Sequence, residues 1–249
     1  MTQRTQTGIT GLDEMLNGGF LPGSAVLIEG APGTGKTTLA TQFLYNGATL
    51  FDEPGLLISF EEFPYTLYRD AESHGWDLHK LEEEHKLRVI FTSPQVFLSS
   101  LQSPVSPLNR TILEWNVRRI ALDSITHFTR LTRNPKELRE IYTMVINGLR
   151  REKITSMLTS EGNTLGLRVS DQSKLAFVVD TILFMRYVEI ESAMQLAILV
   201  LKMRGSDHAK EIRHFEIRQE GVVITGRFEG REGLLTGSPR RIMTDVGKR

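Results

Sequence analysis

Apolar and polar positions follow two different periods along the first two-thirds of the chain. Short continuous apolar runs predict buried strands, and they cover residues 24–30, 55–64, 86–94, 154–161 and a run that ends at Asp123. Between these runs, apolar residues recur every three to four positions, which predicts helices that bury one face. The predicted helices cover residues 37–50, 65–85 and 135–153.

The last third of the chain is mostly strand, over residues 177–190, 195–204 and 212–224. Alternating strands and helices predict an α/β fold with a mostly parallel central sheet and helices on both faces. The later strands extend this sheet in antiparallel fashion. Residues 95–110 are rich in Ser and Pro and predict an irregular connection.

Composition is that of an ordinary globular protein, with 40% apolar and 24% charged residues in a chain of 249. We expect one domain over residues 1–242 and a loose basic tail over residues 243–249. Thirty basic residues balance thirty acidic ones, which does not favour a nucleic-acid partner. There is no cysteine, no apolar signal region and no run of ~20 apolar residues, so we expect a cytoplasmic protein without membrane contact.

The stretch "GAPGTGKT", residues 30–37, fits the pattern G-x-x-x-x-G-K-[ST] between a predicted strand and a predicted helix. Glycines let the backbone turn consecutive N–H groups toward a phosphate, and the following helix points its positive end at the same anion. Lys36 is placed to reach the β- and γ-phosphate oxygens of ATP, and the Thr37 hydroxyl is a ligand for Mg²⁺. The predicted nucleotide-binding residues of this loop are Gly30, Gly33, Thr34, Gly35, Lys36, Thr37 and Thr38.

Three further acidic residues stand at the ends of predicted strands. Asp123 ends the run "RRIALD" and is predicted to complete the Mg²⁺ shell with Thr37, although an Asp here could instead cap the next helix. Glu61 and Glu62 stand at the end of another predicted strand, and adjacent strand residues point to opposite faces, so we expect one carboxylate to face the γ-phosphate. We favour Glu61, as the base that orients the attacking water and as a further Mg²⁺ neighbour, over a pair of solvated acids.

Other candidate chemistry is sparse. The six histidines show no H-E-x-x-H or related spacing, which disfavours a zinc centre. Ser160 and Glu161 end the strand "MLTSE" and are an alternative place for sensing the γ-phosphate. Trp76 is expected in the core rather than stacked on adenine.

Two cations stand two residues apart in the segment "LVLKMRGSDHAKEIRHFEI", residues 199–217. Lys202 and Arg204 lie on one face of a predicted strand and are followed by Gly205 and the Ser206 hydroxyl, which suits a phosphate. The segment lies far along the chain from the phosphate loop. The alternative is a strand with two solvated cations.

Taken together and in order, the segments "TGITGLDEMLNGGFLPGSAVLIEGAPGTGKT", "SFEE", "IALDS", "LKMRGSDHAKEIRHFEI" and "GSPRRI" resemble the KaiC family of circadian-clock ATPases. More broadly, the chain resembles single-domain KaiC-like ATPases of the RecA/DnaB superfamily, over about residues 7–242. The resemblance implies a RecA-like P-loop NTPase fold that binds ATP between neighbouring subunits of a hexameric ring. It implies Glu61 as the catalytic glutamate. It also implies that one segment reaches the neighbour's nucleotide, with Lys202, Met203, Arg204, Ser206, His208 and Lys210.

One departure from the family pattern concerns autophosphorylation. The second KaiC domain carries an adjacent Ser-Thr pair four residues before a "DT" dipeptide, and here Ala176 and Phe177 occupy those positions. Neither side chain has a hydroxyl to phosphorylate. We therefore expect no autokinase activity at this pair, and the departure gives no support to clock partners.

Three functions follow from these residues. The favoured one is a slow Mg²⁺-dependent ATPase in a homo-oligomeric ring with a regulatory or signalling output and a signalling protein as partner. The second is a RecA/RadA-like recombination mediator that binds DNA through the loop over residues 162–173. That loop and its flanks offer Arg168 and Lys174 against Glu161 and Asp171, with no aromatic side chain for stacking on bases. The third is a scaffold that binds ATP with negligible hydrolysis.

Overall fold

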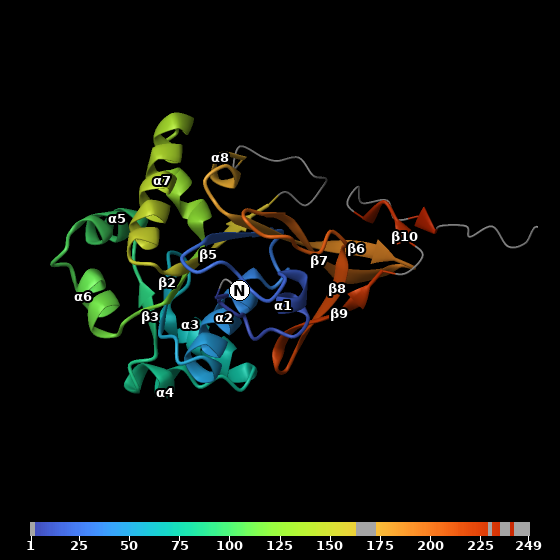
Figure 1. Cartoon of the computed structure of the whole chain (residues 1–249), viewed down its shortest axis with the longest axis horizontal. Coiled ribbons are helices and arrows are strands. Elements are labelled where there is room, and N and C mark those ends of the chain that lie inside the picture. The colour runs from blue at the N-terminus through green and yellow to red at the C-terminus, as the bar shows by residue number, and fades with distance from the viewer. Residues whose placement is uncertain (1–2, 163–172, 229–230, 235–239, 242–249) are drawn as a thin grey trace, which may run out of the picture.

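A nine-stranded sheet runs through the molecule in the computed structural model, which describes residues 3–162, 173–228, 231–234 and 240–241 (Figure 1). The strands are β1 (Ala25–Gly30), β2 (Gly55–Ser59), β3 (Leu87–Phe91), β4 (Arg119–Asp123), β5 (Thr155–Glu161), β6 (Thr181–Ile190), β7 (Ala193–Met203), β8 (Arg213–Arg218) and β9 (Gly221–Arg227). Their order across the sheet is β3-β2-β4-β5-β1-β6-β7-β8-β9. The short strands β10 (Arg231–Glu232) and β11 (Arg240–Arg241) pair with each other.

Parallel pairing joins β3, β2, β4, β5, β1 and β6, and antiparallel pairing adds β7, β8 and β9. The prediction of a mostly parallel sheet extended by antiparallel strands is confirmed. The strands β2 and β4 are buried along their whole length, because helices cover both faces of the parallel part.

Helices pack in two layers on either side of the sheet. The connecting helices are α1 (Leu12–Met15), α2 (Lys36–Leu50), α3 (Pro64–Ser73), α4 (Leu78–Glu83), α5 (Pro94–Gln102), α6 (Pro107–Glu114), α7 (Pro135–Arg151), α8 (Ser173–Ala176) and the 3₁₀ helix η1 (Ile125–Arg130). One apolar core joins α1 to α4 with the sheet, and a second core joins α5 to α8 and η1 with its other face. Trp76 is buried in the first core, as predicted.

Residues 95–110 differ from the predicted irregular connection, because they contribute to the two helices α5 and α6. Each helix begins with a proline at its first position, Pro94 or Pro107. The preceding residue, Ser93 or Ser106, accepts a hydrogen bond from a backbone N–H in the first turn. Serine and proline start a helix as readily as they interrupt one, so composition alone misplaced this segment.

The carboxyl ends of β1, β2, β4 and β5 meet at one edge of the sheet, since these strands are parallel neighbours. Ligands of open α/β sheets bind in the crevice outside these ends. None of the helices in the described part of the chain is both long enough and apolar enough to cross a membrane. The predicted tail, residues 243–249, lies outside the described residues.

Candidate functional site

The phosphate loop joins β1 to α2 through two glycines with left-handed backbone conformations. Gly33 has φ +78° and Gly35 has φ +86°, and Gly35 is the N-cap residue immediately before α2. A side chain is strained at such angles, so glycine is required here. The first turn of α2 then presents its unpaired backbone N–H groups toward the loop, which is the arrangement that binds a phosphate.

Gly30 is required for a different reason, because the backbone of the neighbouring strand approaches it closely. A Cβ built on Gly30 would lie 2.5 Å from the carbonyl oxygen of Met185 on β6 and 2.7 Å from Thr34 Oγ1. The loop is also held from outside by Tyr187, whose hydroxyl donates a 2.7 Å hydrogen bond to the carbonyl of Gly33. Sequence reasoning missed Tyr187, which lies 154 residues away along the chain.

Lys36 lies inside the loop, where Nζ donates a 2.9 Å hydrogen bond to the carbonyl of Ala31. Burial lowers the pKa of the Lys36 ammonium, and the negative charges of Asp123 and Glu161 partly offset that effect. The Lys36 cation is therefore partly desolvated and surrounded by acids, which is an environment that a phosphate group can complete.

Thr37 and Asp123 lie in direct contact, although 86 residues separate them. The Thr37 hydroxyl donates a 3.0 Å hydrogen bond to Asp123 Oδ2, and the Thr159 hydroxyl donates a hydrogen bond to Oδ1. Burial raises the pKa of the Asp123 carboxyl, while the two hydroxyl bonds and the charge of Lys36 act in the opposite direction. The sequence predicted this pair from two separate patterns, and the fold brings them together.

A hydroxyl beside a buried carboxylate fits Mg²⁺, which takes few protein ligands and completes its shell with phosphate oxygens and water. Within the described ranges, no three or more His, Cys, Asp or Glu side chains gather as a ready cluster for a metal ion. The fit therefore rests on Thr37 and Asp123 at the mouth of the phosphate loop.

Glu61 and Glu62 both lie beyond the end of β2, in the bend before α3. The strand alternation that predicts only one inward carboxylate does not apply to a bend. Burial raises the pKa of the Glu62 carboxyl, with further contributions from Asp123, Asp70 and Glu61 in that order. The charge of Glu61 in turn contributes to the raised pKa of Asp123. Both glutamates therefore lie close enough to influence acidic neighbours at this edge.

His127 contacts Glu61 and was not singled out by the sequence. Its Nε2 lies 2.9 Å from Glu61 Oε2, and the His127 side chain is 8% exposed whereas that of Glu61 is 59% exposed. No spacing rule links residues 66 positions apart. The sequence signal that could have pointed to His127 is its position four residues after Asp123, which places it near the carboxyl end of the same strand.

The segment with the two cations lies at the amino ends of the parallel strands, whereas the phosphate loop of the same chain lies at their carboxyl ends. In the register of the sheet, Met203 pairs with Thr181, and Thr181 pairs with Val26 near the amino end of β1. The phosphate loop follows the carboxyl end of β1. Lys202 and Arg204, which flank Met203, are therefore placed away from their own nucleotide site.

Both cations are bound to backbone carbonyls near the end of α8. Lys202 Nζ donates to the carbonyls of Ala176 and Val179 at 2.7 Å each, and Arg204 Nη2 donates to that of Phe177 at 2.7 Å. Burial, followed by the like charge of Arg204, lowers the pKa of the Lys202 ammonium. The two cations thus share one small region at the edge of the molecule.

The remaining predicted residues of this segment have different surroundings. The Met203 side chain packs in the core, so only its backbone could contact a ligand. Ser206 Oγ accepts a 2.8 Å hydrogen bond from Arg4, and Lys210 Nζ lies 3.0 Å from Asp207 Oδ1 and 3.2 Å from His208 Nδ1. None of the predicted residues Ser206, His208 and Lys210 lies in the phosphate loop described above.

The ends of β4 and β5 are joined beside Asp123. Thr126 Oγ1 lies 3.5 Å from Ser160 Oγ and accepts a 3.0 Å hydrogen bond from the backbone N–H of Glu161. Ser160 and Glu161, the alternative sensors, are therefore at the same edge as the phosphate loop. The proposed DNA-contacting loop lies, from residue 163 to residue 172, outside the described residues.

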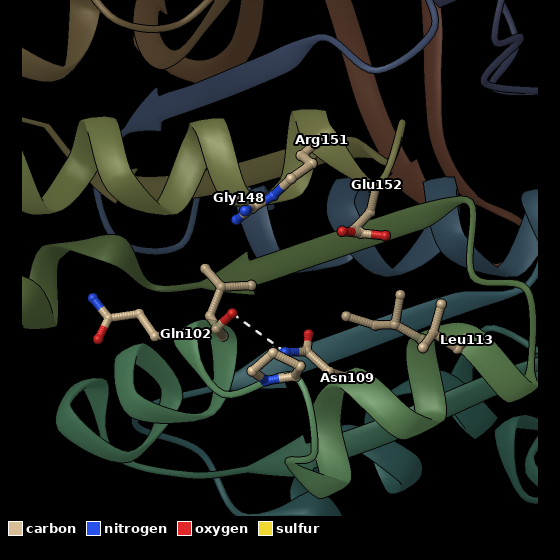
Figure 2. A pocket seen from close by; sticks show the side chains of 9 residues that line it. Gln102, Asn109, Leu113, Gly148, Arg151 and Glu152 are labelled. Atoms are coloured by element: carbon tan, nitrogen blue, oxygen red, sulfur yellow. Dashed lines mark hydrogen bonds between the residues drawn. The ribbon is translucent and has the colours of Figure 1, made fainter.

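A separate pocket of about 230 Å³ lies between α5, α6 and α7 (Figure 2), and none of its lining residues is a predicted site residue. Asn109 on its wall donates hydrogen bonds to the carbonyls of Ser100, Leu101 and Ser103. These bonds hold the connection between α5 and α6, so the amide has a structural use.

Comparisons with known proteins match nearly the whole chain. A family model for the KaiC ATPase matches residues 5–229. The circadian clock oscillator protein KaiC of Thermostichus vulcanus is 36% identical over 243 residues, which are 97% of this chain and 46% of that protein. The corresponding protein of Synechococcus elongatus is 35% identical over the same shares. The chain thus spans about half the length of these relatives.

Among solved structures, a KaiC-like protein from the hyperthermophilic archaeon Pyrococcus horikoshii matches with a TM-score of 0.80 and 30% sequence identity. The match covers 90% of this chain and 100% of the archaeal chain. This similarity confirms the predicted RecA-like α/β fold.

Proposed function

The chain belongs to the KaiC family of ATPases, and from this premise we propose that it is a Mg²⁺-dependent ATPase that works at subunit interfaces of a ring. The contact between Thr37 and Asp123 carries the proposal, because it places a hydroxyl and a buried carboxylate at the mouth of a phosphate loop. This combination of loop, hydroxyl and strand-end acid is what P-loop hydrolysis of a nucleoside triphosphate requires.

Each residue of the site has a distinct part in this proposal. Backbone N–H groups of the loop and the Lys36 ammonium bind the phosphates, while Thr37 and Asp123 hold the Mg²⁺. When bound, the Mg²⁺ neutralises charge on the β- and γ-phosphate oxygens. Glu61 orients the attacking water toward the γ-phosphate.

A cation at the γ-phosphate is still needed to stabilise charge in the transition state. We assign this part to Lys202 and Arg204 of a neighbouring subunit. Their position at the opposite sheet edge supports the assignment, because a head-to-tail arrangement brings that edge of one subunit to the nucleotide of the next. A hexamer is the ring that the family resemblance suggests.

We further propose that hydrolysis is slow and that the ring has a regulatory or signalling output through a protein partner. Ala176 ends α8 and Phe177 follows it, and neither can accept a phosphoryl group, so this output does not use phosphorylation at that pair. Nucleic-acid binding is not favoured, because the chain has no net positive charge.

The proposal is tested by measuring phosphate release from Mg²⁺-ATP by the full chain and by the variant Lys36→Ala. We expect steady phosphate release whose rate per subunit rises with protein concentration, since a subunit without a neighbour lacks the second half of its site. Lys36→Ala should lose both nucleotide binding and hydrolysis. Full activity of a monomer, or hydrolysis that survives in Lys36→Ala, would contradict the proposal.

A further inference from the structure

We propose that His127 is a positioning residue that holds the Glu61 carboxylate for hydrolysis. The inference rests on the proposed role of Glu61 as the group that orients the attacking water. It starts from one contact, the 2.9 Å separation between His127 Nε2 and Glu61 Oε2. His127 itself is not in the phosphate loop and is not assigned to any step by the function proposed above.

The two partners differ greatly in their freedom to move. The Glu61 side chain is 59% exposed and stands on a bend, where an unbound carboxylate would sample several rotamers. The His127 side chain is only 8% exposed. A buried ring that binds an exposed carboxylate restricts the carboxylate, rather than the reverse.

His127 is fixed because the short helix η1 that carries it is bonded at several points. Ser124 Oγ accepts a 3.2 Å hydrogen bond from Thr126 N–H at the start of η1, and donates a 3.3 Å bond to the carbonyl of Thr159 on β5. Thr126 Oγ1 accepts a hydrogen bond from the backbone of Glu161. The helix is thus tied to the end of β5 beside the phosphate loop.

The backbone on the Glu61 side is fixed as well. The Phe60 N–H donates a 2.9 Å hydrogen bond to the carbonyl of Asp123, and the Ser59 hydroxyl bonds both the N–H and the carbonyl of Glu62. The Phe60 ring packs edge-on against Phe128, with centroids 5.1 Å apart. With both backbones held, the His127 bond is what fixes the far end of the Glu61 side chain.

The direction of the bond follows from the other ring nitrogen. Among the residues that the structure describes, His127 Nδ1 is buried and has no hydrogen-bond partner. A buried N–H without an acceptor is costly, so the proton of the neutral ring belongs on Nε2. His127 therefore donates to Glu61 Oε2, which leaves the second carboxylate oxygen to accept a hydrogen bond from water.

The proposal is tested with three variants of His127 in the full-length protein. His127→Leu removes the donor, His127→Gln places an amide N–H near the position of Nε2, and His127→Asn carries an amide that is too short to reach Glu61. We expect kcat to fall about 10- to 100-fold in the Leu and Asn variants with unchanged KM and ATP affinity, because misplacing a reacting group mainly slows chemistry. His127→Gln should recover most of kcat.

His79→Leu is the matched control, because His79 is exposed on α4 and has no part in the site; its kcat should equal that of the unmodified chain. ATP affinity and thermal unfolding of each variant separate loss of catalysis from loss of fold. An unchanged kcat in His127→Leu, or an Asn variant as active as the Gln variant, would overturn the proposal.

A double-mutant cycle separates this inference from the proposed function. With Glu61→Gln already in place, adding His127→Leu should cost nothing more, because the two residues act as one unit. A Glu61→Gln variant with full activity would overturn both the role of Glu61 and that of His127. If the single variant Glu61→Gln is inactive but the single variant His127→Leu is fully active, only the role of His127 is overturned.

Discussion

Arg204 and Phe177 are joined by a 2.7 Å hydrogen bond from the guanidinium Nη2 to the backbone carbonyl. The bond keeps Arg204 at the sheet edge that lies away from its own phosphate loop. In the proposed function, a cation in this position acts on the nucleotide of a neighbouring subunit.

Mixing two inactive variants tests this arrangement. Lys36→Ala loses its own nucleotide site but keeps its cations, and Arg204→Ala keeps its loop but loses the cation that it gives to its neighbour. Arg204→Ala alone should lose about 10³-fold or more of its rate, the size of an arginine contribution in P-loop enzymes, and Lys36→Ala alone should be inactive because it does not bind the nucleotide. In equal mixtures, about a quarter of the interfaces pair an intact loop with an intact cation, and phosphate release should return in proportion.

The mixing result requires proof that rings have mixed, for example by differently labelled subunits. Absence of any recovery in rings shown to be mixed would contradict catalysis in trans. Arg118→Ala, which removes an exposed arginine elsewhere, is the control and should behave as the unmodified chain.

The two adjacent glutamates can be separated by conservative substitution. Glu61→Gln should lower kcat by about 10²-fold or more while ATP affinity is kept, because a neutral amide cannot accept a proton from the attacking water. Glu62→Gln should stay within a few-fold of the unmodified rate, about one order of magnitude at most. Phosphate release and fluorescent-nucleotide binding measure the two effects, and the opposite ranking of the variants would assign the catalytic part to Glu62.

The Thr37–Asp123 pair predicts a specific dependence on Mg²⁺. Asp123→Asn removes the negative charge near the metal, so the Mg²⁺ concentration for half-maximal hydrolysis should rise about 10-fold or more. Thr37→Ala should shift the same quantity in the same direction. The measurement is a Mg²⁺ titration at saturating ATP, and an unchanged midpoint in Asp123→Asn would remove Asp123 from the metal site.

Arg119 predicts a large effect on stability rather than on activity. Its side chain is 0% exposed, and it bonds Glu53 at 2.6 Å and the carbonyls of Phe43 and Gln6 at 2.9 Å each. Arg119→Leu should lower the free energy of unfolding by about 3 kcal/mol, since three acceptors lose their donor. Urea unfolding of the nucleotide-free protein measures this change.

The neighbouring residue offers a matched control for that measurement. Arg118 has the same chemistry but is exposed, so Arg118→Leu should change the free energy of unfolding by no more than about 0.5 kcal/mol. Equal effects of the two substitutions would mean that the contacts of the buried guanidinium contribute little.

Local sequence patterns were sufficient to predict a site where one short stretch carries both the reacting groups and the residues that its backbone conformation requires. The phosphate loop is such a case, because the φ values of +78° at Gly33 and +86° at Gly35 strain any residue that carries a side chain. The same patterns misjudged residues 95–110, where Ser93 and Ser106 cap helices rather than end them. Serine and proline favour both outcomes, and only the packing of Phe97 and Leu108 into the core decides between them.

By itself, the sequence determined the α/β order of elements, the phosphate loop and the presence of an acid at the end of β4, because each depends on neighbours along the chain. Only the tertiary structure decided that His127 meets Glu61, that Arg119 is buried, and that Lys202 and Arg204 stand away from their own loop. These relationships depend on strand order and register, which are set by how the apolar faces of distant segments pack together.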